Sequence, residues 1–209
     1  MARHVAGAFR AALPGVLLFA ADGWIAAGTI FVWQIALFVA LGEGYLAYGG
    51  ALAFAALVGA IGGLTLGRHI DAGHGGRAVW YASGTLTLIV VLRAMATDNA
   101  TVAIMANALG ALGACLYIPT LMTAIYTLAK RSPCTLRFSV ATEGGWDVGG
   151  AMGLLCAALA TSLGVPLSVT ILFSLAGVAA IIVILRRCYA RAAIPASPHA
   201  TAERRAGQR

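Results

Sequence analysis

The sequence predicts an all-α membrane protein with six transmembrane helices, and three observations lead to that prediction. The 209 residues have a mean hydropathy of +0.90, and only 10% of them are charged, against about a quarter in soluble domains. Long apolar runs approach or exceed the roughly 20 residues that a helix needs to cross a bilayer. The runs are continuous and lack the alternation of a β-barrel, and backbone amides in lipid must bond within their own segment.

Six apolar segments follow one another along the chain, and we predict a span for each: residues 12–38, 46–66, 78–96, 101–129, 138–163 and 166–185. The first run is too long for the core of a signal peptide and has no clear cleavage site, so we expect a retained helix. Residues 1–11 then form a short cytoplasmic N-terminus and residues 12–187 the membrane domain. Residues 188–209 are polar and rich in small residues, which predicts a disordered cytoplasmic tail.

The basic residues predict the orientation of these spans. With six spans both termini share one side, and that side holds 13 of the 14 lysines and arginines, whereas the other holds only Arg93. Such a bias places both termini in the cytoplasm, and we expect a bacterial inner membrane. The net charge of +7 is thereby accounted for by topology, so nucleic acid is not expected as a partner.

Two stripes of small residues recur at every fourth position, which keeps each stripe on nearly one helix face. The second span carries Ala51, Ala55, Gly59, Gly63 and Gly67, and the fifth carries Ala141, Gly145, Gly149, Gly153 and Ala157. Small residues let helices approach closely in lipid. The stripes occupy the same place in each set of three spans, which suggests a 3+3 inverted repeat with a packing or moving interface at these glycines.

The polar stretch GRHIDAGHGGR, residues 67–77, joins the second and third spans. It resembles the loop signature of the major facilitator superfamily, a large family of membrane transporters. Gly67 and Asp71 match that signature's first glycine and its aspartate, and Gly75 and Arg77 fit its second glycine and a basic position after a one-residue shift. Ala72 stands where the family has a basic residue. The resemblance extends over residues 12–187.

This resemblance implies one six-helix half of a twelve-helix transporter, more specifically the C-terminal half. It also implies a partner, which is a second six-helix half from the same or another chain. In the family such a loop latches the two halves together, and Asp71 would meet the start of a helix in the other half. Arg68 and Arg77 have two open interpretations, which are pairing with Asp71 or lipid headgroups, and a solvated turn that obeys the basic bias.

Three acidic residues fall inside predicted spans, where a charge costs several kcal/mol and is a functional candidate by default. They are Asp22, Glu143 and Asp147. Glu143 and Asp147 are four residues apart and share a helix face, so their mutual repulsion would favour proton exchange by one of them. Glu143 has an alternative role as an interfacial residue near Arg137 or Lys130.

The resemblance further implies that the first and fourth helices line a central cavity. On these helices the candidates for binding the solute or coupling it to protons are Asp22, Trp24, Trp33, Gln34, Asn107 and Tyr117. Glu143 and Asp147 are further candidates because they are acids within the fifth predicted span. Core or interfacial packing is the alternative for each tryptophan. Hydrogen bonding between helices is the alternative for Gln34 and Asn107. Tyr117 precedes Pro119, which can kink the fourth span beside a cavity.

The leading functional hypothesis is a secondary transporter module, a permease that moves a small solute with protons by alternating access. No nucleotide-binding motif is present, and we expect no cofactor, no metal site and no enzymatic activity. An intramembrane protease built on Ser83 would need a histidine base in a span, and all four histidines lie outside the spans. The alternative is a non-transporting assembly subunit or a fragment of a longer transporter. The expected partners are a small solute, membrane lipid and the second half.

Overall fold

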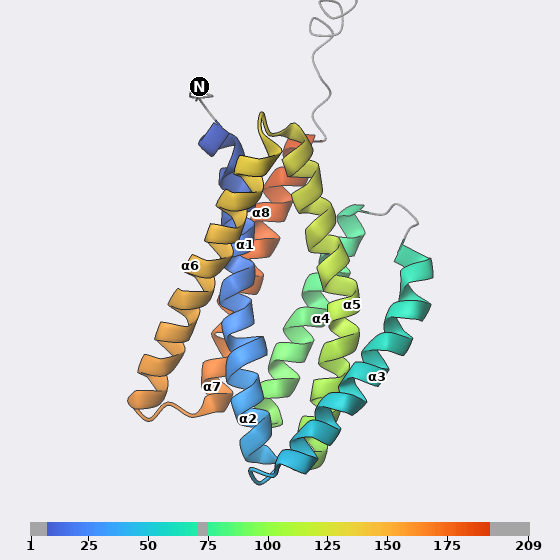
Figure 1. The fold of residues 1–209 in the computed structure, drawn as a ribbon, viewed down its shortest axis with the longest axis vertical. Helices are drawn as coiled ribbons and strands as arrows, with labels where there is room; N and C mark the ends of the chain where they lie inside the picture. The colour runs from blue at the N-terminus through green and yellow to red at the C-terminus, as the bar shows by residue number, and fades with distance from the viewer. Residues whose placement is uncertain (1–7, 71–74, 193–209) are drawn as a thin grey trace, which may run out of the picture.

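The chain folds into six helical rods that run alternately up and down (Figure 1). The structure is a computed structural model that describes residues 8–70 and 75–192, with the side chains of residues 9–65 and 79–187. Every element in these ranges is helical: α1 (Ala8–Ala26), η1 (Ala27–Val32), α2 (Trp33–Ala40), α3 (Tyr45–Ile70), α4 (Gly75–Met95), α5 (Ala100–Arg131), α6 (Thr135–Ser162), α7 (Leu167–Leu172) and α8 (Ser174–Ala192). The first rod combines α1, η1 and α2, and the sixth combines α7 and α8.

Two of the predicted segments are interrupted, which the apolar pattern did not indicate. Residues 27–32 of the first rod form a π-helix, in which the N–H of Trp33 bonds to the carbonyl of Gly28 five residues earlier. The sixth rod begins after Pro166, whose fixed φ suits a helix start. That rod breaks at Phe173, which separates α7 from α8. Both interruptions lie in the part of the bundle where the first and sixth rods meet.

Within the described residues, four stretches are long and apolar enough to cross a membrane: Phe9–Ala40, Tyr45–Thr65, Ala100–Arg131 and Leu167–Arg187. Val79–Met95 of α4 is apolar but shorter, and α6 falls short in apolar character despite its 28 residues. The helices are therefore those of an integral membrane protein. The prediction of six helical segments agrees with the rods, whereas membrane-spanning length and composition are found for four of them.

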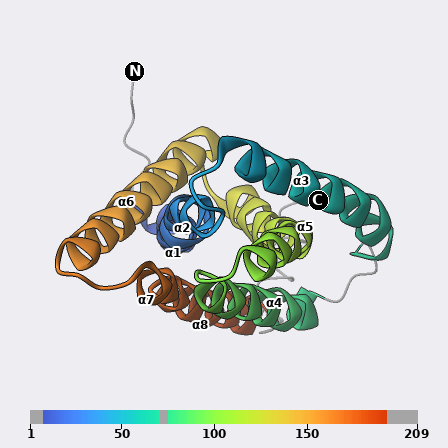
Figure 2. The same ribbon diagram turned by 90° about the horizontal axis from the view of Figure 1, so that it is seen from below.

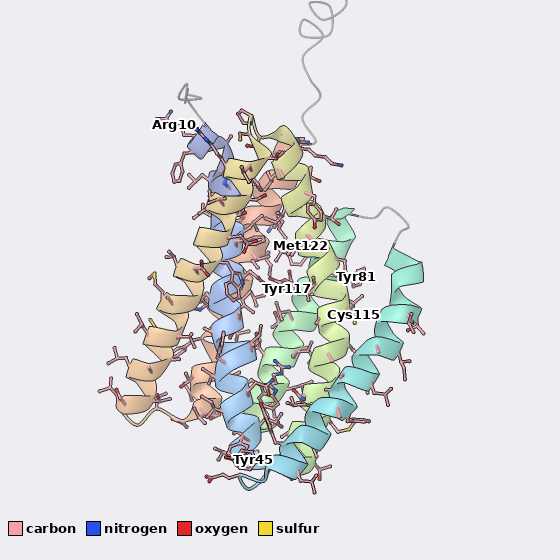
Figure 3. All side chains as sticks on the ribbon, in the orientation of Figure 1. Arg10, Tyr45, Tyr81, Cys115, Tyr117 and Met122 are labelled. Atoms are coloured by element: carbon pink, nitrogen blue, oxygen red, sulfur yellow. The ribbon has the colours of Figure 1, made fainter. Side chains whose placement is uncertain are left out.

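The rods pack in two groups that meet where α4 contacts the sixth rod (Figure 2). In one group α1 packs against α6 and α8, and in the other α5 packs against α3 and α4. The start of α1 and the end of α8 lie at the same end of the bundle, where Figure 3 labels Arg10. Tyr45, at the start of α3, marks the opposite end.

Two clusters of buried apolar side chains hold the groups together. One surrounds Leu18, Phe138 and Ile181 towards the end of the bundle where α1 begins. The other surrounds Trp33 and Ile171 near the opposite end. Between the helices that carry these clusters, the packing leaves the internal space described below.

Candidate functional site

The backbone of α6 lies directly against that of α1, and glycines make this approach possible. A Cβ at Gly149 would fall on the backbone of Ala20, and a Cβ at Gly153 would come within 2.7 Å of the Ala27 Cβ. A Cβ at Gly145 would likewise meet the backbone of Val16. The small stripe predicted in the fifth span therefore faces α1, and this contact brings Trp146 of α6 close to α1.

The other small stripe, on α3, faces α5. Ala51 and Ala55 are buried, a Cβ at Gly59 would lie 3.2 Å from the Ala111 Cβ, and one at Gly63 would lie 3.8 Å from the Cys115 Sγ. The contacts of the two stripes are thus made within the chain, to α1 and to α5. Gly59, Gly63, Gly145, Gly149 and Gly153 therefore face other helices of this chain and do not present a common face for a second half.

A cavity of about 510 Å³ lies between the first rod, α3, α4 and α5, and Trp146 of α6 adds to its wall. Its volume falls in the range that holds small organic ligands. Most of the lining is aliphatic, and polar groups interrupt it at a few places. The polar lining residues are Asp22, Thr29, Gln34, Arg93, Asn107, Tyr117 and Trp146.

Asp22 is the acidic residue of this cavity, and both of its carboxylate oxygens accept hydrogen bonds. The Tyr117 hydroxyl donates to Oδ1 at 2.5 Å, and the Trp146 indole Nε1 donates to Oδ2 at 3.1 Å. Tyr117 lies between α5 and α1 in Figure 3. One carboxylate thereby connects three helices, α1, α5 and α6, at the cavity wall.

Arg93 is the basic residue of the cavity, and only 8% of it is exposed. Its Nη1 donates to the carbonyl of Thr29 at 2.7 Å, and its guanidinium carbon lies 5.0 Å from the centre of the Trp33 ring. The guanidinium also occupies the space that a side chain at Gly110 would need. Its Nε has no hydrogen-bond partner. The sequence interpretation counted Arg93 as the one basic residue on the side opposite the termini and did not predict its place in the cavity.

An amide network crosses the same region of the bundle. The buried Trp33 Nε1 donates to Asn107 Oδ1 at 3.0 Å, and Asn107 Nδ2 donates to the carbonyl of Ala51 at 3.4 Å. The Tyr48 hydroxyl donates to Gln34 Oε1 at 2.9 Å. Gln34 and Asn107 therefore line the cavity, and they also form hydrogen bonds between helices, which was the alternative considered for them. Their role in binding a solute stays a prediction.

The remaining candidates lie away from the cavity lining. Trp24 donates its indole N–H to the carbonyl of Phe173 at 2.7 Å, at the break between α7 and α8. Glu143 and Asp147 are exposed on the outer side of α6. The loop candidates fall outside the described side chains, so their latch role stays a prediction; they are Gly67, Arg68, Asp71, Gly75 and Arg77.

Trp146 is a cavity residue that sequence reasoning passed over, although its neighbours were singled out. Gly145 and Gly149 contact α1, so the stripe of small residues alone could have indicated which face of α6 packs against α1. Asp147 is two residues from Gly145, or about 200° around the helix, so it faces away from α1, whereas Trp146 is only about 100° away. Among the described side chains, no three His, Cys, Asp or Glu residues gather as metal ligands.

The chain was compared with protein-family models, curated proteins and solved structures. No protein-family model, no curated protein and no solved structure matches the chain.

Proposed function

We propose that the chain is a secondary transporter module, one six-helix half of the major-facilitator type that moves a small solute by alternating access. The observation that carries the proposal is the cavity with the partly buried carboxylate of Asp22 in its wall, inside a bundle of apolar helices. Ionisable residues inside membrane helices are costly and mark solute or proton pathways. Asp22 is therefore the proton-coupling residue of the proposal.

The surroundings of Asp22 support this role. Protonation removes its charge, and Tyr117 and Trp146 donate to its two oxygens when it is charged. A carboxylate between two donors can alternate between a charged, hydrogen-bonded form and a neutral form as access to the cavity changes sides. Such an exchange couples solute movement to protons.

The packing pattern supports the 3+3 repeat of the proposal. A 3+3 repeat pairs the first rod with the fourth, the second with the fifth and the third with the sixth. Under this pairing the α1–α6 contact corresponds to the α5–α3 contact, and the α1–α8 contact corresponds to the α5–α4 contact. The contact of α4 with the sixth rod maps onto itself. Three rods per repeat is an odd number, so the two repeats run in opposite directions, as in inverted-repeat transporters.

The outer face of α6 supports a second half. Glu143 and Asp147 are exposed there, about 12 and 18 Å along the helix from its start at 1.5 Å per residue. A carboxylate that faced lipid at such a depth would cost a few kcal/mol, and a partner bundle would remove that cost. Because the glycine stripes are occupied within the chain, the interface with the second half uses this outer face.

The end of the bundle at which α1 starts and α8 ends also carries the basic residues of α5, α6 and α8. Lys130 and Arg131 lie in the last turn of α5, and Arg137 lies near the start of α6. This distribution supports cytoplasmic termini by the positive-inside rule.

The first test is the protein mass of the purified chain in nanodiscs, with lipid subtracted. A dimer supports a self-paired twelve-helix carrier. Proteoliposomes that enclose a pH-sensitive dye then report proton movement while small anionic, cationic and neutral solutes are added outside. We expect one solute class to drive protons in the wild type and not in Asp22→Asn.

The matched control is Asp98→Asn, an exposed acid at the turn after α4, which we expect to keep wild-type coupling. Both variants must insert and remain monodisperse. Equal proton movement by Asp22→Asn and the wild type would refute Asp22 as the coupling residue. No response to any solute in the dimer would instead favour a non-transporting assembly subunit.

A further inference from the structure

We infer that the cavity binds an organic anion, a carboxylate with an apolar body, and that Arg93 is the residue that binds its charged group. The inference rests on the proposed function, because it names the substrate class of the same cavity. It rests on three observations: the unpaired charge of Arg93, the separation of Arg93 from Asp22, and the aliphatic lining of the cavity.

Arg93 carries a buried charge that no carboxylate among the described side chains neutralises. Its side chain is 8% exposed, and its one hydrogen bond goes to the neutral carbonyl of Thr29. Among the described side chains no carboxylate forms an ion pair with it, and its Nε has no hydrogen-bond partner. An arginine inside the membrane is costly unless it is paired, so a ligand anion that enters the cavity would supply the missing charge.

Asp22 does not serve as that partner. Both of its oxygens are occupied by Tyr117 and Trp146. Arg93 bonds to Thr29, seven residues further along the first rod, which puts the acid and the base about 10 Å apart along the helix axis at 1.5 Å per residue. One cavity therefore has a cationic end and a separate proton-accepting end.

The guanidinium fits a carboxylate in particular. Its planar set of donors matches the two oxygens of a carboxylate, and such pairs are among the stronger hydrogen bonds in proteins. The Trp33 ring and the space left by Gly110 hold the guanidinium in place. Most of the remaining lining is aliphatic, with Ile25, Leu86, Ile89, Ile118 and Leu121 among its residues. That lining favours an apolar body over a sugar or another polyhydroxylated solute.

The test is direct binding of radiolabelled benzoate to the full chain in nanodiscs of zwitterionic lipid. Benzylamine and benzyl alcohol are matched probes that keep the ring and change only the charge. We expect benzoate to bind and unlabelled benzylamine and benzyl alcohol to compete poorly. We expect Arg93→Gln to lower benzoate affinity by about tenfold or more, the loss of a charge-assisted pair, and Arg93→Lys to restore part of it.

Arg137→Gln is the matched control, because Arg137 is an exposed arginine on α6 away from the cavity, and its affinity should stay within about twofold of wild type. Gly110→Ala provides a second route if Arg93→Gln does not fold, since its methyl group would displace the guanidinium. We expect it to weaken benzoate binding in the same direction.

Each outcome bears on one proposal at a time. Equal affinity for benzoate in wild type, Arg93→Gln and Gly110→Ala would overturn the inference, and so would preferential binding of benzylamine. Loss of benzoate binding on adding anionic lipid would overturn it as well, because the guanidinium would then hold a lipid headgroup. Benzoate binding without solute-driven proton movement would support the anion site and refute the transporter.

Discussion

Replacing Gly149 with alanine should separate α6 from α1 and destabilise the bundle. The Cβ that this substitution adds would fall on the carbonyl of Ala20, and the three nearest atoms are all backbone atoms of that residue. A backbone carbonyl in a helix cannot rotate away as a side chain does. The two helices must therefore move apart along the contact that also positions Trp146 against Asp22.

The magnitude can be worked out against a neighbouring glycine. Gly144 lies on the same helix, and a Cβ there would have no atom within 4 Å. Both substitutions change the intrinsic helix propensity by the same amount, so the difference between them isolates the steric cost. Overpacking costs typically 1–3 kcal/mol, and the backbone contact places Gly149→Ala towards the upper end of that range relative to Gly144→Ala.

The assay is reversible unfolding in mixed micelles of mild detergent and dodecyl sulfate, followed by far-ultraviolet circular dichroism. Gly149→Ala should unfold at a lower fraction of dodecyl sulfate than wild type, and Gly144→Ala should not. Two variants whose unfolding free energies agree within about 0.5 kcal/mol, the usual range of exposed substitutions, would refute the close contact of α6 with α1.

Three further substitutions test the cavity wall and the outer face. Tyr117→Phe removes the donor to Asp22 Oδ1 and should cost about 1.5–3 kcal/mol of unfolding free energy; an unchanged value would mean that this hydrogen bond does not form. Asn107→Leu leaves the buried indole N–H of Trp33 unpaired and should lower the unfolding free energy by about 1–3 kcal/mol. The loss should be smaller in a Trp33→Phe background, and a double-mutant cycle measures this difference as the coupling energy of the pair. Additive effects would contradict the hydrogen bond. Asp147→Asn changes an exposed residue and should leave the unfolding of the monomer within about 0.5 kcal/mol of wild type while weakening dimers in nanodiscs; a destabilised monomer would place Asp147 in an intrachain contact.

The apolar runs predicted the helical segments because run length is a one-dimensional property. Asp22 could be singled out for a similar reason, since an acid within an apolar run is costly wherever the helix points. The structure adds that this carboxylate meets Tyr117 of α5, another candidate from the sequence, and Trp146 of α6.

Arg93 could not be placed from sequence, because its direction depends on another helix. It lies two residues before the end of α4, where a long basic side chain can extend outward to the interface. The Arg93 side chain packs into the bundle because Gly110 of α5 has no side chain in its way. The sequence of α4 gives no information about that glycine. The π-helix is a similar case, since the stretch AGTIFV is an ordinary apolar sequence.

That π-helix decides which residues of the first rod share a face. Twelve α-helical steps of about 100° would rotate Gln34 about 120° away from Asp22. A π-turn accommodates one extra residue, so the total rotation is smaller by about one 100° step. The two side chains then lie about 20° apart around the rod. Both residues line the cavity. The first rod therefore contains two helical registers joined at residues 27–32, and a single helical wheel drawn through all of it would assign the cavity face wrongly on one side of the junction.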